Sequence, residues 1–159
     1  MPNLFKDYSD GSKFTGEFNS SGQRHGVGRL QLADSGGEYV GEWLEGYPSG
    51  LGCVHFSDGS RFAGEFVAGR PHGSGVWSSA GSSLSYVGQF FEGKPQGAGR
   101  MKFADGTAGV PRHEGWFQAN QLIKRAVAEE RPALEEEARR AETLAQRADQ
   151  LAREITAEN

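Results

Sequence analysis

The sequence has little cysteine, no long apolar run and no apolar leader. Cys53 is the single cysteine among 159 residues, which excludes an internal disulfide framework and suits a reducing compartment. No stretch approaches the ~20 apolar residues of a membrane span, and residues 1–8 lack the apolar core of a signal peptide. A net charge of −4 gives no general reason to expect nucleic acid as a partner. We therefore expect a soluble, mildly acidic, cytoplasmic protein of one domain.

Glycine, in contrast, is abundant and regularly spaced. A frame of aromatic-x-Gly-Glu-aromatic, followed by Gly-x-x-x-Gly-x-Gly, occurs four times, with Gln89 replacing the glutamate in the fourth copy. The first copy has one extra residue before Gly22. The first glycines of successive copies lie 25, 23 and 24 residues apart. Glycine-rich disorder shows no such spacing, so four in-phase copies predict a repeat protein.

Each copy is interpreted as one β-hairpin. Apolar and polar residues alternate in both halves of the copy, which is typical of strands with two different faces. The Asp-Gly pairs at Asp10, Asp58 and Asp105 predict type I′ turns between copies, and the glycine cluster inside each copy predicts a longer turn. One hairpin is marginal in water, so successive hairpins should pair edge to edge. About ten strands would make a meander roughly 45 Å long and ~17 Å wide.

The pattern changes near the end of the chain. A degenerate fifth copy at His113–Phe117 has Asn120 in place of a glycine, so we expect the sheet domain to occupy residues 1–120. We expect a linker or short helix at 121–131. Apolar residues then recur at steps of three and four, which predicts an amphipathic helix at 132–157. That helix either caps the last sheet edge or docks on a partner through apolar residues spaced by seven.

The frame Y/F-x-G-E-W/F-x-x-G-x-x-x-G-x-G resembles the MORN repeat, and the resemblance covers roughly residues 5–120. It implies a mainly β fold, a single-layer antiparallel β-meander, here followed by the C-terminal α-helix. It also implies a scaffold or adaptor at cytoskeletal and membrane-proximal sites, which in some members holds a myosin tail. We accordingly expect no enzyme activity and no cofactor. The implied location is the cytoplasm, at the cytoskeleton of an actin protrusion or of a cilium or flagellum.

A single-layer sheet has no second layer, so a row of its aromatic side chains can remain open as a groove. We expect this groove to receive an extended or helical segment of a protein partner. The predicted groove residues are the rings of the five copies: Phe14, Phe18, Tyr39, Trp43, Phe62, Phe66, Tyr86, Phe90 and Phe117. The alternative is that these rings are simply core. The pattern leaves open which row of rings faces the groove.

Two other functions compete with partner binding. Arg24, Arg70 and Lys94 lie along one row of hairpin turns, in the first, third and fourth copies, and are possible contacts for an anionic lipid surface. Polybasic lipid sites, however, usually have about four to eight such residues. Alternatively, the chain is a structural subunit of a ciliary or flagellar assembly, in which the C-terminal helix docks on a neighbour.

No catalytic or metal site is predicted. Glu17, Glu42 and Glu65 recur once per copy, at positions ~10 Å apart, and no acid–base partner accompanies them, so we expect them to bind backbone amides or arginines. His25 and His72 lie two copies apart, about 19 Å, which is too far to share a zinc ion. The Gly-x-Gly pairs open strands and lack a following Gly-Lys-Ser/Thr, which favours turns over phosphate binding.

Overall fold

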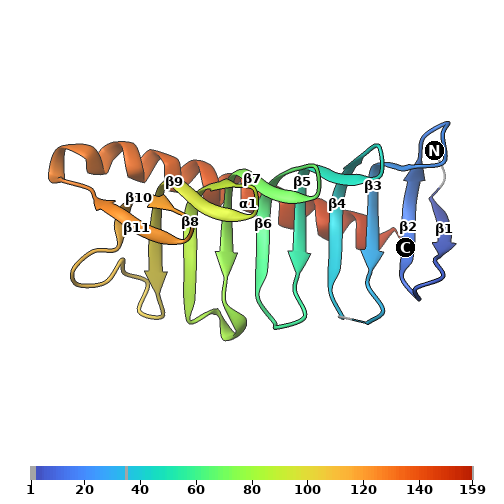
Figure 1. Ribbon diagram of the computed structural model, residues 1–159, viewed down its shortest axis with the longest axis horizontal. Helices are drawn as coiled ribbons and strands as arrows, with labels where there is room; N and C mark the ends of the chain where they lie inside the picture. The colour runs from blue at the N-terminus through green and yellow to red at the C-terminus, as the bar shows by residue number, and fades with distance from the viewer. Residues whose placement is uncertain (1–2, 35, 159) are drawn as a thin grey trace.

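The computed structural model describes residues 3–34 and 36–158, which form one open antiparallel sheet and one long helix (Figure 1). Neighbouring strands in the sheet are neighbours in the sequence, from β1 to β11. The predicted fold class, a β-meander with a C-terminal helix, is confirmed. The strands are β1 (Leu4–Asp7), β2 (Lys13–Phe18), β3 (Arg24–Gln31), β4 (Glu38–Leu44), β5 (Tyr47–His55), β6 (Arg61–Val67), β7 (Arg70–Ser78), β8 (Leu84–Phe91), β9 (Lys94–Phe103), β10 (Glu114–Gln118) and β11 (Gln121–Arg125). Short 3-10 turns lie at Ala80–Ser82 and Ala128–Glu130, and the helix α1 is Arg131–Ala157.

The Asp-Gly turns differ from the prediction. In the first of them only Gly11 has a positive φ, +86°, and its N–H donates to the carbonyl of Tyr8. This is a type I turn followed by a left-handed glycine, so the predicted type I′ turn is wrong. The reason is a local hydrogen bond: the Asp10 carboxylate accepts the N–H of Ser12 at 2.8 Å, an arrangement that such side chains favour in turns.

The type I′ turns lie inside the copies instead, where a longer turn was predicted. Glu45 and Gly46 both have positive φ, +48° and +94°, and they form a two-residue connection between β4 and β5. Such turns match the twist of the flanking strands. In the first copy, the extra residue gives a three-residue connection between Asn19 and Gln23. Asn120 replaces glycine with a φ of +74°, in agreement with the sequence.

The residue at the glutamate position of the four full copies stabilises a bulge beside the turn. The Glu42 carboxylate accepts the backbone N–H of Leu51 at 2.7 Å, where the pairing of β4 with β5 shifts register. The equivalent bonds join Glu17 to Val27, Glu65 to Ser74 and Gln89 to Ala98. The predicted structural role of these residues is therefore confirmed.

The two faces of the sheet have different side chains. We call one the aromatic face, because the nine predicted groove rings lie on it and form a continuous series of edge-to-face contacts from Phe18 to Phe117. Their centroids lie 4.7–5.3 Å apart, which is a favourable spacing for ring pairs. The opposite face, here called the α1 face, carries small apolar residues such as Cys53, Ala63 and Val87.

Helix α1 covers the α1 face and contacts β3 through β9 (Figure 1). Its alanines pack on small sheet residues: Ala148 and Ala145 against Cys53 and Ala63, and Ala141 against Val87. The predicted cap over the last sheet edge is wrong, because that edge is β11 and α1 lies over a face. The apolar residues spaced by seven are buried within the chain itself: Leu134, Ala141, Ala148 and Ile155.

The sheet also continues beyond residue 120. Asn120 completes a tight turn into β11, which pairs with β10. Part of the predicted linker at 121–131 is therefore a strand, and a 3-10 turn then leads directly into α1.

Ion pairs attach α1 to the sheet at several points. At its start, the buried carboxylate of Glu114 contacts Arg131 of α1 at 3.3 Å, Arg112 at 2.5 Å and Arg100 of β9 at 3.0 Å. Further along, Glu142 pairs with Lys102 at 3.1 Å. The helix is thus held by complementary charges as well as by apolar packing.

Candidate functional site

The predicted groove residues form an interior layer on the aromatic face. Eight of the nine are at most 5% exposed, and Phe18 is partly buried. Their burial follows from their neighbours: the Phe62 ring contacts Phe66 and Phe90 and lies over Gly75. The structure therefore brings all nine together, covered by one another, by neighbouring apolar side chains and by the sheet backbone. Their contact with a partner stays a prediction.

A second set of apolar residues on the same face is more open. These residues follow the Gly-x-Gly pairs in the second half of each copy. Four of them lie opposite buried rings, as Trp77 lies opposite Phe62 and Tyr86. We call this set the apolar rim. Its members are Leu30, Leu32, Val54, Phe56, Trp77, Met101 and Phe103. Leu32, Phe56 and Phe103 are 43%, 41% and 36% exposed.

Two cavities open on the aromatic face beside the rim. One, of about 390 Å³, lies across β7–β10 and is lined by Trp77, Met101 and Phe117, among others. The second, of about 300 Å³, lies across β3–β5 and includes Leu30 and Phe56 in its lining. Rim side chains and buried rings thus line both hollows. The rim was not among the predicted site residues. The alternation after each Gly-x-Gly, which only Ser79 interrupts, placed these residues on one face but did not distinguish them from other strand residues.

The three basic residues predicted for lipid contact do not form one patch. Arg24 lies on the aromatic face, 4.7 Å from the Trp43 ring, and it donates to the carbonyl of Gly46 at 3.1 Å. Arg70 and Lys94 are exposed at the starts of β7 and β9. They pair with Val67 and Phe91, which places them on the α1 side of the sheet.

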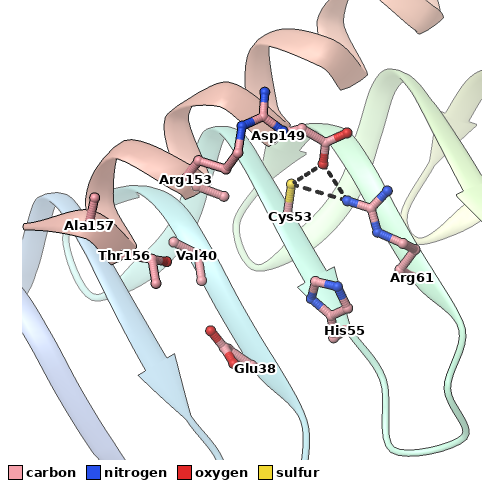
Figure 2. A pocket seen from close by; sticks show the side chains of 10 residues that line it. Glu38, Val40, Cys53, His55, Arg61, Asp149, Arg153, Thr156 and Ala157 are labelled. Carbon is pink, nitrogen blue, oxygen red and sulfur yellow. Dashed lines mark hydrogen bonds and ion pairs between the residues drawn. The ribbon is translucent and has the colours of Figure 1, made fainter. Parts of the chain in front are cut away.

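A further cavity, of about 490 Å³, lies between the sheet and the C-terminal half of α1 (Figure 2). Cys53, Arg61 and Asp149 converge at one side of it. The Cys53 thiol donates to Asp149 Oδ1 at 3.1 Å, and the Arg61 guanidinium pairs with the same carboxylate. Burial, together with the hydrogen bond to Asp149, raises the pKa of the Cys53 thiol to about 12. The thiol is therefore protonated at neutral pH and is a poor nucleophile.

We expect Cys53 in the native protein to react with iodoacetamide at pH 8 at least a hundredfold more slowly than in the denatured chain, because so little thiolate is present. Mass spectrometry of timed samples measures the rate, and the same protein in guanidinium chloride is the control. Equal rates in the two states would contradict the protected, protonated thiol.

Within residues 3–34 and 36–158, no three His, Cys, Asp or Glu side chains gather as a metal site. No helix in that part of the chain is both long and apolar enough to cross a membrane.

Comparison with known proteins agrees with the repeat architecture. The family model for the MORN repeat matches residues 14–37, 39–61, 62–83 and 86–108, together more than half of the chain. The chain is also 51% identical over 39 residues to the MORN repeat-containing protein 4 homolog of Drosophila melanogaster. That match covers 24% of this chain and 19% of the relative, so the chain spans well under two thirds of the relative's length. The predicted resemblance is confirmed, and the chain belongs to the MORN-repeat family.

Proposed function

We propose that this protein is a non-enzymatic scaffold that binds a segment of a protein partner on its aromatic face. The family is associated with protein or membrane binding in general. The observation that supports a protein partner is the apolar rim, which stays partly open beside two cavities while α1 covers the other face.

The shape of the surface supports a peptide-like occupant. Exposed apolar residues grouped in one area mark interaction sites more often than scattered ones do. The two cavities each have room for a few side chains, and buried rings give them a rigid floor. An extended segment or an amphipathic helix can insert alternate side chains into such hollows.

The identity of the partner is proposed from the family resemblance. We extend the proposal to a cytoskeletal or motor protein, with a myosin tail as the favoured example. The corresponding location is the cytoplasm at the cytoskeleton, in an actin protrusion or a cilium.

A capture experiment with two matched double variants tests the aromatic face. The Phe56→Ser/Met101→Ser protein loses apolar contacts beside both cavities, and we expect it to retain at most a tenth of the captured partner, because buried apolar anchors dominate binding. The control, Leu44→Ser/Val67→Ser, removes residues that are 51% and 53% exposed away from this face.

Partners are captured from a cell lysate and quantified by mass spectrometry, after circular dichroism has shown that both variants remain folded. Equal capture by the two variants, or a larger loss in the control, would refute binding on the aromatic face.

A second candidate is attachment to an anionic membrane along the type I′ turns. Four apolar residues at this edge are 46–61% exposed: Leu44, Tyr47, Val67 and Phe91. Arg70 and Lys94 lie directly across from two of them. If this edge binds lipid, flotation with phosphatidylserine vesicles will recover the native protein, and Arg70→Glu/Lys94→Glu will abolish the recovery. Absence of flotation by the native protein would exclude this candidate.

A further inference from the structure

We infer that the segment bound on the aromatic face is acidic as well as apolar, with carboxylates toward both ends. This inference rests on the proposed function and specifies the chemistry of the partner. It follows from an unequal distribution of charge between the two faces of the sheet.

The carboxylates of the strands all lie on the α1 face. Side chains alternate between faces along a strand, and residues paired directly across strands share a face. Glu42, for example, lies between Gly41 and Trp43 of the aromatic face and therefore points the other way. By the same rule, all six carboxylates in the strands point away from the aromatic face: Asp7, Glu17, Glu38, Glu42, Glu65 and Glu114.

The charged strand residues on the aromatic face are cations at its two ends. Lys6 lies 5.1 Å from the Tyr8 ring and pairs across from Phe14, and Arg24 lies over Trp43. At the other end, Arg125 pairs with Gly115, two residues before Phe117. Lys6 and Arg125 are exposed. The charged side chains that the strands place on the aromatic face are thus all cations, in a chain whose net charge is −4.

Complementary charge sets the specificity of an interface and excludes wrong partners. A basic or uncharged segment would gain nothing from Lys6 and Arg125, whereas carboxylates near both ends of a segment would pair with them. An anionic membrane fits less well, because polybasic lipid sites usually have about four to eight basic residues. In addition, the rim residues border concave hollows, which suit separate side chains better than a flat surface.

The spacing of the two cavities and of the cations indicates the length of the bound segment and the separation of its apolar residues. The cavities are centred near β4 and between β8 and β9, so they lie at least ~20 Å apart at ~4.8 Å per strand. Two apolar anchors in an extended chain would then be about six residues apart, at ~3.3 Å per residue. The cations at β1–β3 and β11 lie outside the cavities, and about 14 residues would span the whole face.

Selection from a displayed library of random 16-residue peptides tests the inference on the full chain. We expect the enriched peptides to have more Asp and Glu than Lys and Arg, concentrated in their outer thirds, with two apolar residues about six apart. Binding of synthetic copies, followed by fluorescence anisotropy, should weaken about tenfold in Lys6→Glu/Arg125→Glu, and it should weaken with added salt. The control, Lys13→Glu/Arg139→Glu, reverses two exposed cations elsewhere and should change affinity less than twofold.

The outcomes separate this inference from the proposed function. If the enriched peptides lose binding in Phe56→Ser/Met101→Ser but are not acidic, the aromatic face binds segments and the inference is wrong. If no peptide is enriched, or if the enriched peptides bind Phe56→Ser/Met101→Ser as tightly as the native protein, both the proposed function and the inference are wrong. If Lys6→Glu/Arg125→Glu leaves peptide binding unchanged but abolishes binding to phosphatidylserine vesicles, the cations of the aromatic face bind lipid and the inference is wrong.

Discussion

Replacing Gly75 by alanine should lower the free energy of unfolding by about 3 kcal/mol, because it forces extra volume into a packed layer. The Phe62 ring, which is 1% exposed, lies directly over this glycine. An added methyl group would overlap the ring and would lie 2.8 Å from the carbonyl of Ala63. The ring has little room to move, since its centroid is 5.3 Å from that of Phe66 and 4.7 Å from that of Phe90.

Urea denaturation followed by circular dichroism measures this loss. Gly93→Ala is the matched control: it lies at φ +88° with no atom within 4 Å, so the new methyl group introduces backbone strain alone. A left-handed alanine costs about 1–2 kcal/mol. If the control were destabilised as much as Gly75→Ala, ring packing would not be the reason for glycine at this position.

The substitution Glu114→Gln should cost about 2–3 kcal/mol at pH 7. This carboxylate is 1% exposed and is the shared partner of Arg100, Arg112 and Arg131. Removing one member of a fully buried pair costs about 3–5 kcal/mol. The expected value is lower here, because Arg112 and Arg131 keep 45% of their side-chain surface in water. The substitution should destabilise the start of α1 and the end of the sheet together, because Glu114 of β10 pairs with Arg131 of α1.

The effect should depend on pH in a defined direction. The hydrogen bond from Arg112, helped by the charge of Arg100, holds the pKa of Glu114 below its usual value of 4.5. A lowered pKa in the folded state stabilises the protein above the unfolded pKa, and this contribution is lost as the pH falls through the folded pKa. The difference between native protein and Glu114→Gln should therefore shrink as the pH falls below about 4.5.

Parallel urea titrations at pH 7 and pH 3 measure this difference, with Glu129→Gln as the control because Glu129 is an exposed carboxylate close to the start of α1. The control should change stability by less than 0.5 kcal/mol at either pH. A loss in Glu114→Gln that is equally large at pH 3 would show that shape, rather than charge, makes this residue important.

Much of the sheet could be predicted from local pattern. The period near 24 and the alternation within each copy correctly indicated hairpins paired in sequence order, and Asn120 was correctly expected to take a glycine's place. Turn geometry was harder to predict. Asp10-Gly11 suits a type I′ turn, but the same pair also suits a type I turn followed by a left-handed glycine. The strand register, which depends on pairing across the hairpin, decides between them.

The candidate site was predicted in part for a similar reason. Alternation placed all nine rings on one face, and the structure agrees. Each full copy has one edge-to-face pair of its own. The continuous layer also needs ring contacts between neighbouring copies, which no single copy contains. The more open rim residues, such as Trp77 and Met101, follow the same two-residue alternation as any half-buried strand. The sequence therefore did not identify them as a site.

The repeat period and the two-residue alternation were sufficient to specify a narrow meander with one aromatic face, because both depend on neighbours in the chain. The position of α1 depended on contacts between distant residues. Its alanine stripe predicted a helix that buries one side, but not the surface that it covers. The pair of Arg61 with Asp149, separated by 88 residues, and the fit of Ala148 against Cys53 place it on one face. The aromatic face stays open because the helix packs closely where the sheet side chains are small.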